Sequence, residues 1–160
     1  MEPDVRAFGD LLANTALARD WEGVHDLLAP WLKERLSVAE VRGFFEDDYA
    51  EILNENNISG THFPELPYVS GNDSSLAFLR EASEVVPRPR PIPAEVTDDN
   101  FRQWMKLQLL CSEEQADALG FDYFTEVWLI VVAHDGYLRV GYWSHNPYEC
   151  GPIEPAHGAS

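Results

Sequence analysis

Side chains that could exchange protons lie at both ends of one stretch, EVWLIVVAHDGYLRVGYWSH, which runs from Glu126 to His145. Asp135 and Gly136 near its centre favour a two-residue turn with positive φ, so the stretch is predicted to form a β-hairpin. In that hairpin Glu126 faces His145, and an acid–imidazole pair of this kind could act as a general base. The same two residues could instead form a structural cross-strand ion pair, which is the use we favour.

The other titratable side chains predict no further catalytic centre. His25 falls outside the apolar stripe of its helix and Asp48 lies in an acidic run, so we expect both side chains to face water. The histidines are scattered along the chain, without the spacing of a zinc site. A glycine-rich phosphate loop and a nucleophile elbow are also lacking, so we expect neither a metal nor another cofactor.

The predicted turn also determines which side chains share a face of the sheet, because side chains alternate along a strand. One face is almost entirely apolar and should carry the helices. The strand FRQWMKLQLLC, which begins at Phe101, alternates in the same way and would add Trp104 and Lys106 to the other face. The predicted pairs on that other face are His134 with Tyr137, Val132 with Arg139, Ile130 with Gly141, Trp128 with Trp143, and Glu126 with His145.

Aromatic side chains that gather on a sheet face without helices are rarely left in water. We expect a second copy of the chain to bury this face, since aromatic residues and arginine are typical of interface cores. Cover by the middle segment or the C-terminal tail, and binding of a ligand, are the alternatives. The candidate interface or ligand surface consists of Trp104, Trp128, Trp143, Glu126, His145 and Arg139.

The first third of the chain is predicted to be helical, because its apolar residues recur at helical spacing. Asp20 is a predicted N-cap of a second helix, which Pro30 should interrupt. Ser37 and Glu40 have the spacing of a capping box, so a third helix should follow and reach about Leu53.

The middle of the chain is less regular. The stretch PELPYVSGND is predicted to be loop with a short strand, and SLAFLREASEVV a helix that passes into a strand. Residues 84–96 contain PRPRPIP and should form an extended, proline-rich connector. Residues 147–160 should form a loose C-terminal tail, and residues 1–160 together a single domain.

Composition restricts the partners. The 160 residues include 11 lysines and arginines and 28 aspartates and glutamates, which gives a net charge of −17. Phosphates would be repelled, so nucleic acid and anionic membranes are not expected as partners. An acidic surface could attract a basic protein or mimic nucleic acid, but its simplest use is solubility, which we favour. No apolar stretch approaches the roughly 20 residues of a membrane helix, and the acidic amino terminus does not have the form of a signal peptide, so we expect a cytoplasmic protein.

Three helices followed by a twisted antiparallel meander resemble the NTF2-like (cystatin-like α+β) superfamily, especially its small bacterial members. The resemblance lies in the DWEG sequence that begins at Asp20, in LLAPWLKERLSVAEV from Leu27 to Val41, and in VWLIVVAHDGYLRVGYW near the C-terminal end. It covers roughly residues 4–55 and 95–146. The long middle of this chain departs from the short examples of the fold.

The resemblance implies an α+β fold in which N-terminal helices pack on a curved antiparallel sheet and enclose a conical pocket. It also implies frequent dimerisation through the sheet. Such proteins include isomerases and dehydratases as well as non-enzymatic binding or assembly modules, so the fold alone does not select a function. We favour a binding or assembly module, with a small apolar ligand or a basic protein as partner, over a small-molecule isomerase or dehydratase. The expected pocket residues are Tyr49, Tyr142, Met105 and Leu129.

Overall fold

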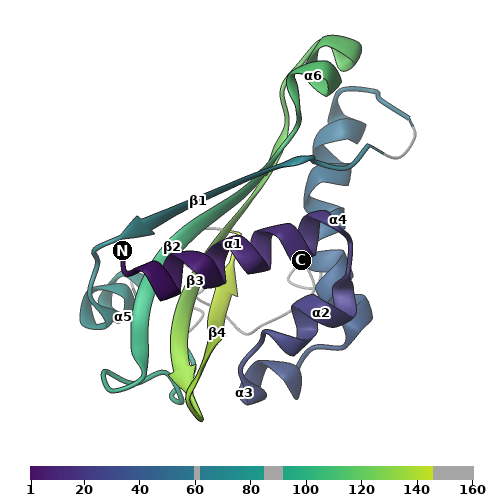
Figure 1. The fold of residues 1–160 in the computed structure, drawn as a ribbon. Helices are drawn as coiled ribbons and strands as arrows, with labels where there is room; N and C mark the ends of the chain where they lie inside the picture. Colours follow the sequence, from purple (N-terminus) through teal and green to yellow (C-terminus); the bar gives the residue numbers. More distant parts are fainter. Residues whose placement is uncertain (60–61, 85–91, 146–160) are drawn as a thin grey trace.

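The computed structural model describes residues 1–59, 62–84 and 92–145, and it has the α+β class expected from the sequence. The predicted C-terminal tail and most of the predicted connector lie outside these residues. N-terminal helices pack against a four-stranded antiparallel sheet (Figure 1). In chain order, the elements are α1 (Pro3–Leu17), α2 (Trp21–Asp26), α3 (Pro30–Lys33), α4 (Val38–Glu55), β1 (Leu66–Asn72), α5 (Leu76–Glu84), β2 (Phe101–Leu110), α6 (Glu113–Leu119), β3 (Phe124–His134) and β4 (Tyr137–Ser144).

The local signals for the helix starts are confirmed. The Asp20 carboxylate accepts a hydrogen bond from the Gly23 backbone N–H at 3.0 Å, as an N-cap does. Pro30 interrupts the second predicted helix and begins α3. The Ser37 hydroxyl and the Glu40 carboxylate form both hydrogen bonds of a capping box at the start of α4.

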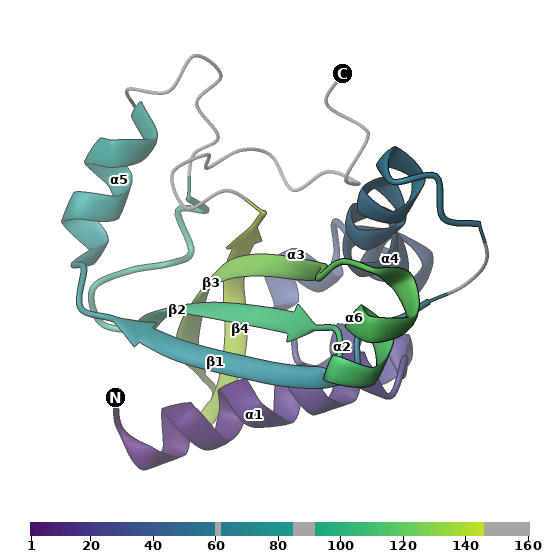
Figure 2. The same ribbon diagram turned by 90° about the horizontal axis from the view of Figure 1, so that it is seen from above.

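The four strands are neighbours in the order β1-β2-β3-β4, so the sheet is a simple meander. We call the side that packs on α1 the inner face and the opposite side the outer face. Gly9 of α1 lets the helix approach the inner face closely, since a Cβ there would lie 2.9 Å from Val69 and 3.1 Å from Met105. Figure 2 shows α1 along one side of the strands and α5 on the other.

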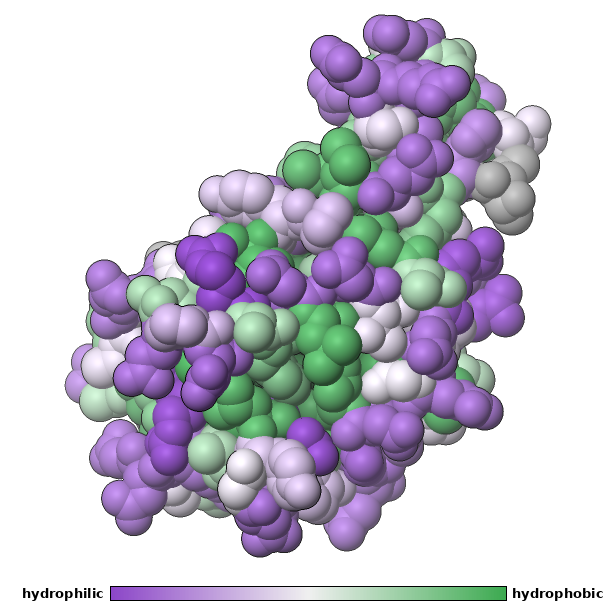
Figure 3. Space-filling model, in the orientation of Figure 1, coloured by the Kyte–Doolittle hydropathy of each residue, from purple (hydrophilic) through white to green (hydrophobic). Residues whose placement is uncertain are grey.

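The inner face and the helices enclose the hydrophobic core. Its fully buried side chains come from every layer, with Leu12 of α1, Phe45 of α4 and Leu107 of β2 among the largest. Figure 3 views the molecule from the side of α1, where apolar side chains gather in the centre and polar ones surround them. Burial of this apolar surface is the main favourable contribution to folding.

The predicted hairpin turn is confirmed. Asp135 and Gly136 have φ values of 51° and 81°, as a two-residue turn of this kind requires. Near the turn the predicted register is also correct, since His134 pairs with Tyr137 and Val132 with Arg139.

Further from the turn the predicted register is wrong, because a β-bulge leaves Gly141 without a partner residue on β3. Ile130 therefore pairs with Tyr142, and Trp128 pairs with Ser144 rather than with Trp143. The bulge shifts β4 by one residue, which exchanges the faces of all the side chains beyond it.

The bulge lies where the chain between α2 and α3 meets the edge of β4. The backbone N–H of Ala29 donates to the carbonyl of Val140, and the N–H of Val140 donates to Leu27, both at 2.8 Å. The indole Nε1–H of Trp31 donates to the carbonyl of Gly141 at 2.8 Å. These contacts join residues that are more than 100 positions apart in sequence, so local pattern alone did not reveal them.

The segment after the proline-rich stretch covers part of the outer face. Val96 is fully buried, and it lies beside Gly141 and Val132 on that face. Arg80 of α5 holds the segment by donating hydrogen bonds to the carbonyls of Ile92 and Pro93. The middle of the chain was one of the segments that could cover the aromatic face. It does cover the end of that face near the hairpin turn.

Candidate functional site

The outer face is arranged in rows of side chains that the strand register defines. One row contains Trp104, Ile130 and Tyr142, which are buried like Val132 at the hairpin end, and the next row contains Lys106, Trp128 and Ser144. The following row contains Tyr68, Gln108 and Glu126, and the last row, beside α6, contains Leu66, Leu110 and Phe124.

Two of the three predicted interface tryptophans meet on this face. The ring centroids of Trp104 and Trp128 lie 4.9 Å apart. The Lys106 ammonium lies 5.9 Å from the centroid of Trp128 and 5.6 Å from that of Tyr68, so the face combines aromatic rings with a cation.

Glu126 is also on the outer face, as predicted, but its partner is not His145. Its carboxylate accepts hydrogen bonds from the Gln108 amide at 3.1 Å and from the Trp128 indole at 3.2 Å. Arg139 lies near the turn, where its guanidinium is 5.1 Å from the ring centroid of Tyr137, and it therefore belongs to the hairpin end of the face. The predicted Glu126–His145 pair is thus wrong, because the bulge lies between the turn and these two residues and shifts the register of β4 by one residue.

The third tryptophan lies on the inner face, contrary to the prediction. Trp143 pairs with Leu129 and stacks on Phe44 of α4, with ring centroids 4.4 Å apart. Tyr142 is displaced the other way, to the outer face, so its predicted role as an inner pocket residue is also wrong.

His145 continues the stack under α4. Its ring lies 4.0 Å from the centroid of Phe44 and nearly parallel to it, so Phe44 is held between an indole and an imidazole. The His145 Nε2 is 2.7 Å from the Phe44 carbonyl oxygen. Since a carbonyl only accepts hydrogen bonds, this nitrogen carries the proton.

Asp48 on α4 has His145 and Thr125 as electrostatic neighbours, and we call these three residues the Asp48 cluster. Burial, the largest influence, raises the pKa of Asp48 above its usual value. The charge of His145, the Thr125 hydroxyl and the Glu126 backbone amide oppose this by lowering the pKa. Thr125 is fully buried, and its hydroxyl has no partner with hydrogen-bond geometry among the described residues.

The prediction that Asp48 faces water is therefore wrong. The missed signal was its spacing, because Asp48 follows the buried residues Val41, Phe44 and Phe45 at the intervals that place side chains on one face of a helix. The local run of acidic residues obscured this position.

His25 makes a contact of its own, since its Nε2 lies 2.8 Å from the Leu36 carbonyl oxygen, away from the cluster.

The conical pocket expected between the helices and the sheet is filled at its predicted residues. Met105 and Leu129 each have 0% of their surface exposed. Tyr49 is buried in a second apolar cluster with Leu53, Cys111 and Tyr123. Burial there raises the pKa of Tyr123 to about 12. Met105 and Leu129 therefore belong to the core rather than to a substrate chamber between the helices and the sheet.

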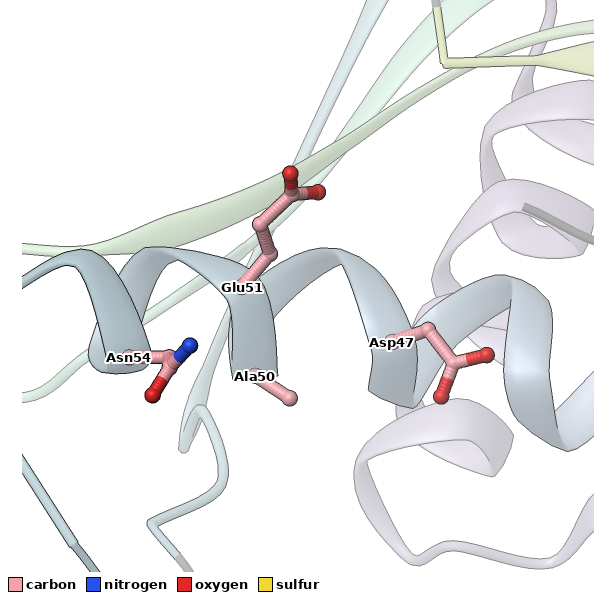
Figure 4. Close-up of a pocket in the computed structure, with 4 residues that line it drawn as sticks. All are labelled: Asp47, Ala50, Glu51 and Asn54. Atoms are coloured by element: carbon pink, nitrogen blue, oxygen red, sulfur yellow. The ribbon is translucent and has the colours of Figure 1, made fainter. Parts of the chain in front are cut away.

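Open grooves lie on the solvent side of α4. One, of about 470 Å³, is lined by Asp47, Ala50, Glu51 and Asn54. Figure 4 shows that these side chains all project from α4, with the Glu51 carboxylate directed away from that of Asp47. A second groove of about 330 Å³ lies between this helix and Ile58, and Tyr49 contributes to it. Both grooves are lined in part by carboxylates, which are Asp47 and Glu51 in the first and Glu46 and Asp47 in the second.

Within residues 1–59, 62–84 and 92–145, histidine, cysteine, aspartate and glutamate form no group of three or more that could hold a metal ion. Cys111 is buried and free, and Cys150 lies outside these ranges. Among the described helices, none has the length and apolar character needed to cross a membrane.

The sequence matches no protein-family model, and comparisons with curated proteins and with solved structures give no significant match. The resemblance to the NTF2-like superfamily therefore stays a prediction. The function has to be argued from the surfaces and clusters of the molecule itself.

Proposed function

We propose that the protein is a non-enzymatic binding or assembly module of NTF2-like type that works in the cytoplasm. The observation that carries the proposal is the complete burial of Met105 and Leu129. An enzyme of this fold would hold its substrate between the helices and the sheet, and large side chains occupy that space at these two residues. The function then belongs to the outside of the molecule.

We propose a basic protein as the partner. The chain carries a net charge of −17, which speeds the encounter with a positively charged surface and repels acidic ones. The aromatic rings of Tyr68 and Trp128 on the outer face add apolar area for such a contact, and they already lie close to one cation, Lys106.

A homodimer through the outer face is the second candidate. The half-buried ring of Trp128 supports it, since aromatic side chains are enriched in interface cores, whereas Trp104 is only 4% exposed and is already covered within the chain. Two observations weigh against it: Val96 already covers one end of the face, and each copy would bring a charge of −17. Sedimentation at micromolar concentration tests the homodimer directly. A monomeric chain at that concentration would exclude it and leave the basic protein as the proposed partner.

A small-molecule isomerase or dehydratase is the alternative activity, and the cluster of Asp48, Thr125 and His145 favours it. A half-buried carboxylate with a raised pKa beside an imidazole is a common arrangement for proton transfer. The grooves at α4, and a third one between α5 and residues 94–98, do not include these three residues. The filled interior at Met105 and Leu129 makes the binding module the first candidate.

A thermal-shift screen separates the two classes. Basic peptides should raise the melting temperature, whereas small carbonyl compounds and lipophilic metabolites should not. A ligand at 100 times its dissociation constant stabilises a protein by about 2.7 kcal/mol, which is roughly 5–10 °C for a domain of this size. Stabilisation by a carbonyl compound that disappears in Asp48→Asn would instead support the enzyme.

A further inference from the structure

The last row of the outer face, together with Tyr68, forms an apolar patch. Leu66 of β1 lies opposite Leu110 of β2, and Leu110 lies opposite Phe124 of β3. Because neighbouring strands are about 4.8 Å apart, this row spans about 10 Å across the sheet. Tyr68 stands one row away on β1. We call Leu66, Tyr68, Leu110 and Phe124 the distal patch.

The distal patch is unusually exposed for such large side chains. Leu66, Tyr68 and Phe124 are 47%, 46% and 44% exposed, and they are three of the seven exposed large hydrophobic residues described. The other four are spread over α1, its N-terminal neighbour, α5 and the hairpin turn. Single exposed apolar residues are ordinary, whereas several together on one sheet face mark a contact surface.

The elements nearby pack elsewhere. Val96, which covers the outer face, lies beside Gly141 at the opposite end of the sheet. Two apolar residues of α6, Ala116 and Leu119, pack against the second apolar cluster, to which α4 contributes Tyr49 and Leu53. The side chains of the distal patch therefore stay at least partly exposed in the described part of the chain, and a partner molecule could cover them.

The charge around the patch specifies that partner. One cation, Lys106, lies beside the patch, 5.6 Å from the Tyr68 ring centroid. From Leu107 to Val127 the chain has no other lysine or arginine, and its carboxylates are Glu113, Glu114, Asp117, Asp122 and Glu126. Glu65 directly precedes the patch on β1. A second copy of the chain would bring the same carboxylates together, which costs free energy, whereas a basic surface would be attracted.

We infer that the distal patch docks a segment of a basic partner protein that presents apolar side chains between lysines or arginines. The inference rests on the proposed function and assigns it a surface. The apolar side chains would cover Leu66, Leu110 and Phe124, and the cations would lie near the carboxylates of α6 and the β3 start. Affinity would depend on both parts, since the charge brings the partner in and the apolar row holds it.

The test uses the full chain and three synthetic peptides of equal length: alternating lysine and leucine, alternating lysine and serine, and alternating glutamate and leucine. Amide chemical shifts in NMR spectra locate the binding site. The lysine–leucine peptide should shift the amides of Leu66 to Ser70 and of Phe124 to Trp128. The lysine–serine peptide should bind about tenfold more weakly or worse, because it covers no apolar area, and the glutamate–leucine peptide should not bind.

Phe124→Ser and Leu66→Ser should each weaken binding of the lysine–leucine peptide by about tenfold. Phe78→Ser is the matched control, because Phe78 is a large side chain on α5 with 49% exposure, and it should leave the affinity unchanged. The two patch variants lie on different strands, so failure of one to fold leaves the other. Circular dichroism checks the fold of each.

Four results would overturn the inference. Shifts confined to the grooves of α4, or equal affinity for the lysine–leucine and lysine–serine peptides, would leave a binding module with another surface. A dimer that Phe124→Ser dissociates would assign the patch to a second copy. Absence of binding by every basic peptide, together with stabilisation by a carbonyl compound through Asp48, would remove the proposed function as well.

Discussion

Trp143 lies opposite Leu129 across the last strand pair, and its indole stacks on Phe44 of α4 with 4.4 Å between ring centroids. This arrangement follows from the bulge at Gly141, which moves the end of β4 by one residue. The same shift brings His145 under α4, within reach of Asp48. A single unpaired residue therefore determines whether the end of β4 contributes to the contact face or to the core.

Gly141→Ala should destabilise the protein. A Cβ at this position would lie 2.6 Å from Val132 Cγ1, in a place where backbone contacts from the α2–α3 connection hold the strand. Overpacking of this kind costs about 1–3 kcal/mol, measured as the change in the free energy of unfolding in urea.

Gly43→Ala is the matched control for that variant. Gly43 lies inside α4, and the nearest atom to an added Cβ is the flexible Asp47 carboxylate at 3.1 Å. Alanine should therefore stabilise the helix by about 0.5–1 kcal/mol. Equal effects of the two substitutions would contradict the close packing proposed at the bulge.

Asp48→Asn should raise stability at neutral pH. Burial raises the pKa of Asp48, so the folded state holds the proton more tightly than the unfolded state does. The stability that the protonated carboxyl contributes is fully present below its usual pKa of 3.8 and is lost as the pH rises through the raised value. Melting temperatures across pH 3–7 should therefore differ most at the neutral end of the series.

Glu46→Gln should have the opposite effect. Burial, the largest influence, favours the neutral acid, but the hydrogen bonds and charges of Arg42 and Arg19 together hold the pKa of Glu46 below its usual value. Both arginines contact the carboxylate at 2.8 Å. The ionised Glu46 carboxylate therefore contributes to the free energy of unfolding above pH 4.5, its usual pKa. This contribution is lost as the pH falls through the lowered pKa of the folded state.

Because solvent screens these ion pairs, the loss in Glu46→Gln at neutral pH should be about 1 kcal/mol or less. Urea unfolding at pH 7 and at pH 3 measures it, and the difference from the native protein should shrink at the lower pH. A variant that is less stable by the same amount at both values would show that packing, rather than charge, is the cause.

Leu129→Ala should open a cavity inside the protein and cost about 2–5 kcal/mol of stability. Leu129 is fully buried among apolar neighbours, so the new space should be dry and able to take a small apolar ligand such as benzene. Benzene should then raise the melting temperature of the variant and not that of the native chain. Stabilisation of the native chain by benzene would reveal a cavity that the packed interior does not predict.

Much of the secondary structure followed from short-range patterns. Asp20, Pro30 and Ser37 determine helix starts through their own backbone and capping chemistry, and each acts as its sequence neighbourhood predicts. The turn at Asp135 and Gly136 is equally local, because only a few residue types tolerate its positive φ. These features needed no knowledge of distant residues.

The candidate site was less predictable. The sequence placed Trp104 and Trp128 correctly on one face, since β2 and β3 alternate regularly along the residues that carry them. It misplaced Trp143 and Tyr142 and paired Glu126 with His145, because a bulge has no reliable signature in one strand. It also missed Asp48, whose burial depends on how α4 lies against β3 and β4.

The sequence by itself determined the α+β class, the helix starts, the hairpin turn and the acidic charge, because each arises from neighbouring residues or from composition. The tertiary structure alone decided the register beyond Gly141, the filling of the interior at Met105 and Leu129, and the exposure of the distal patch. Those features depend on contacts between residues far apart in the chain, such as Trp31 with the Gly141 carbonyl, and such contacts exist only once the helices and the sheet have packed together.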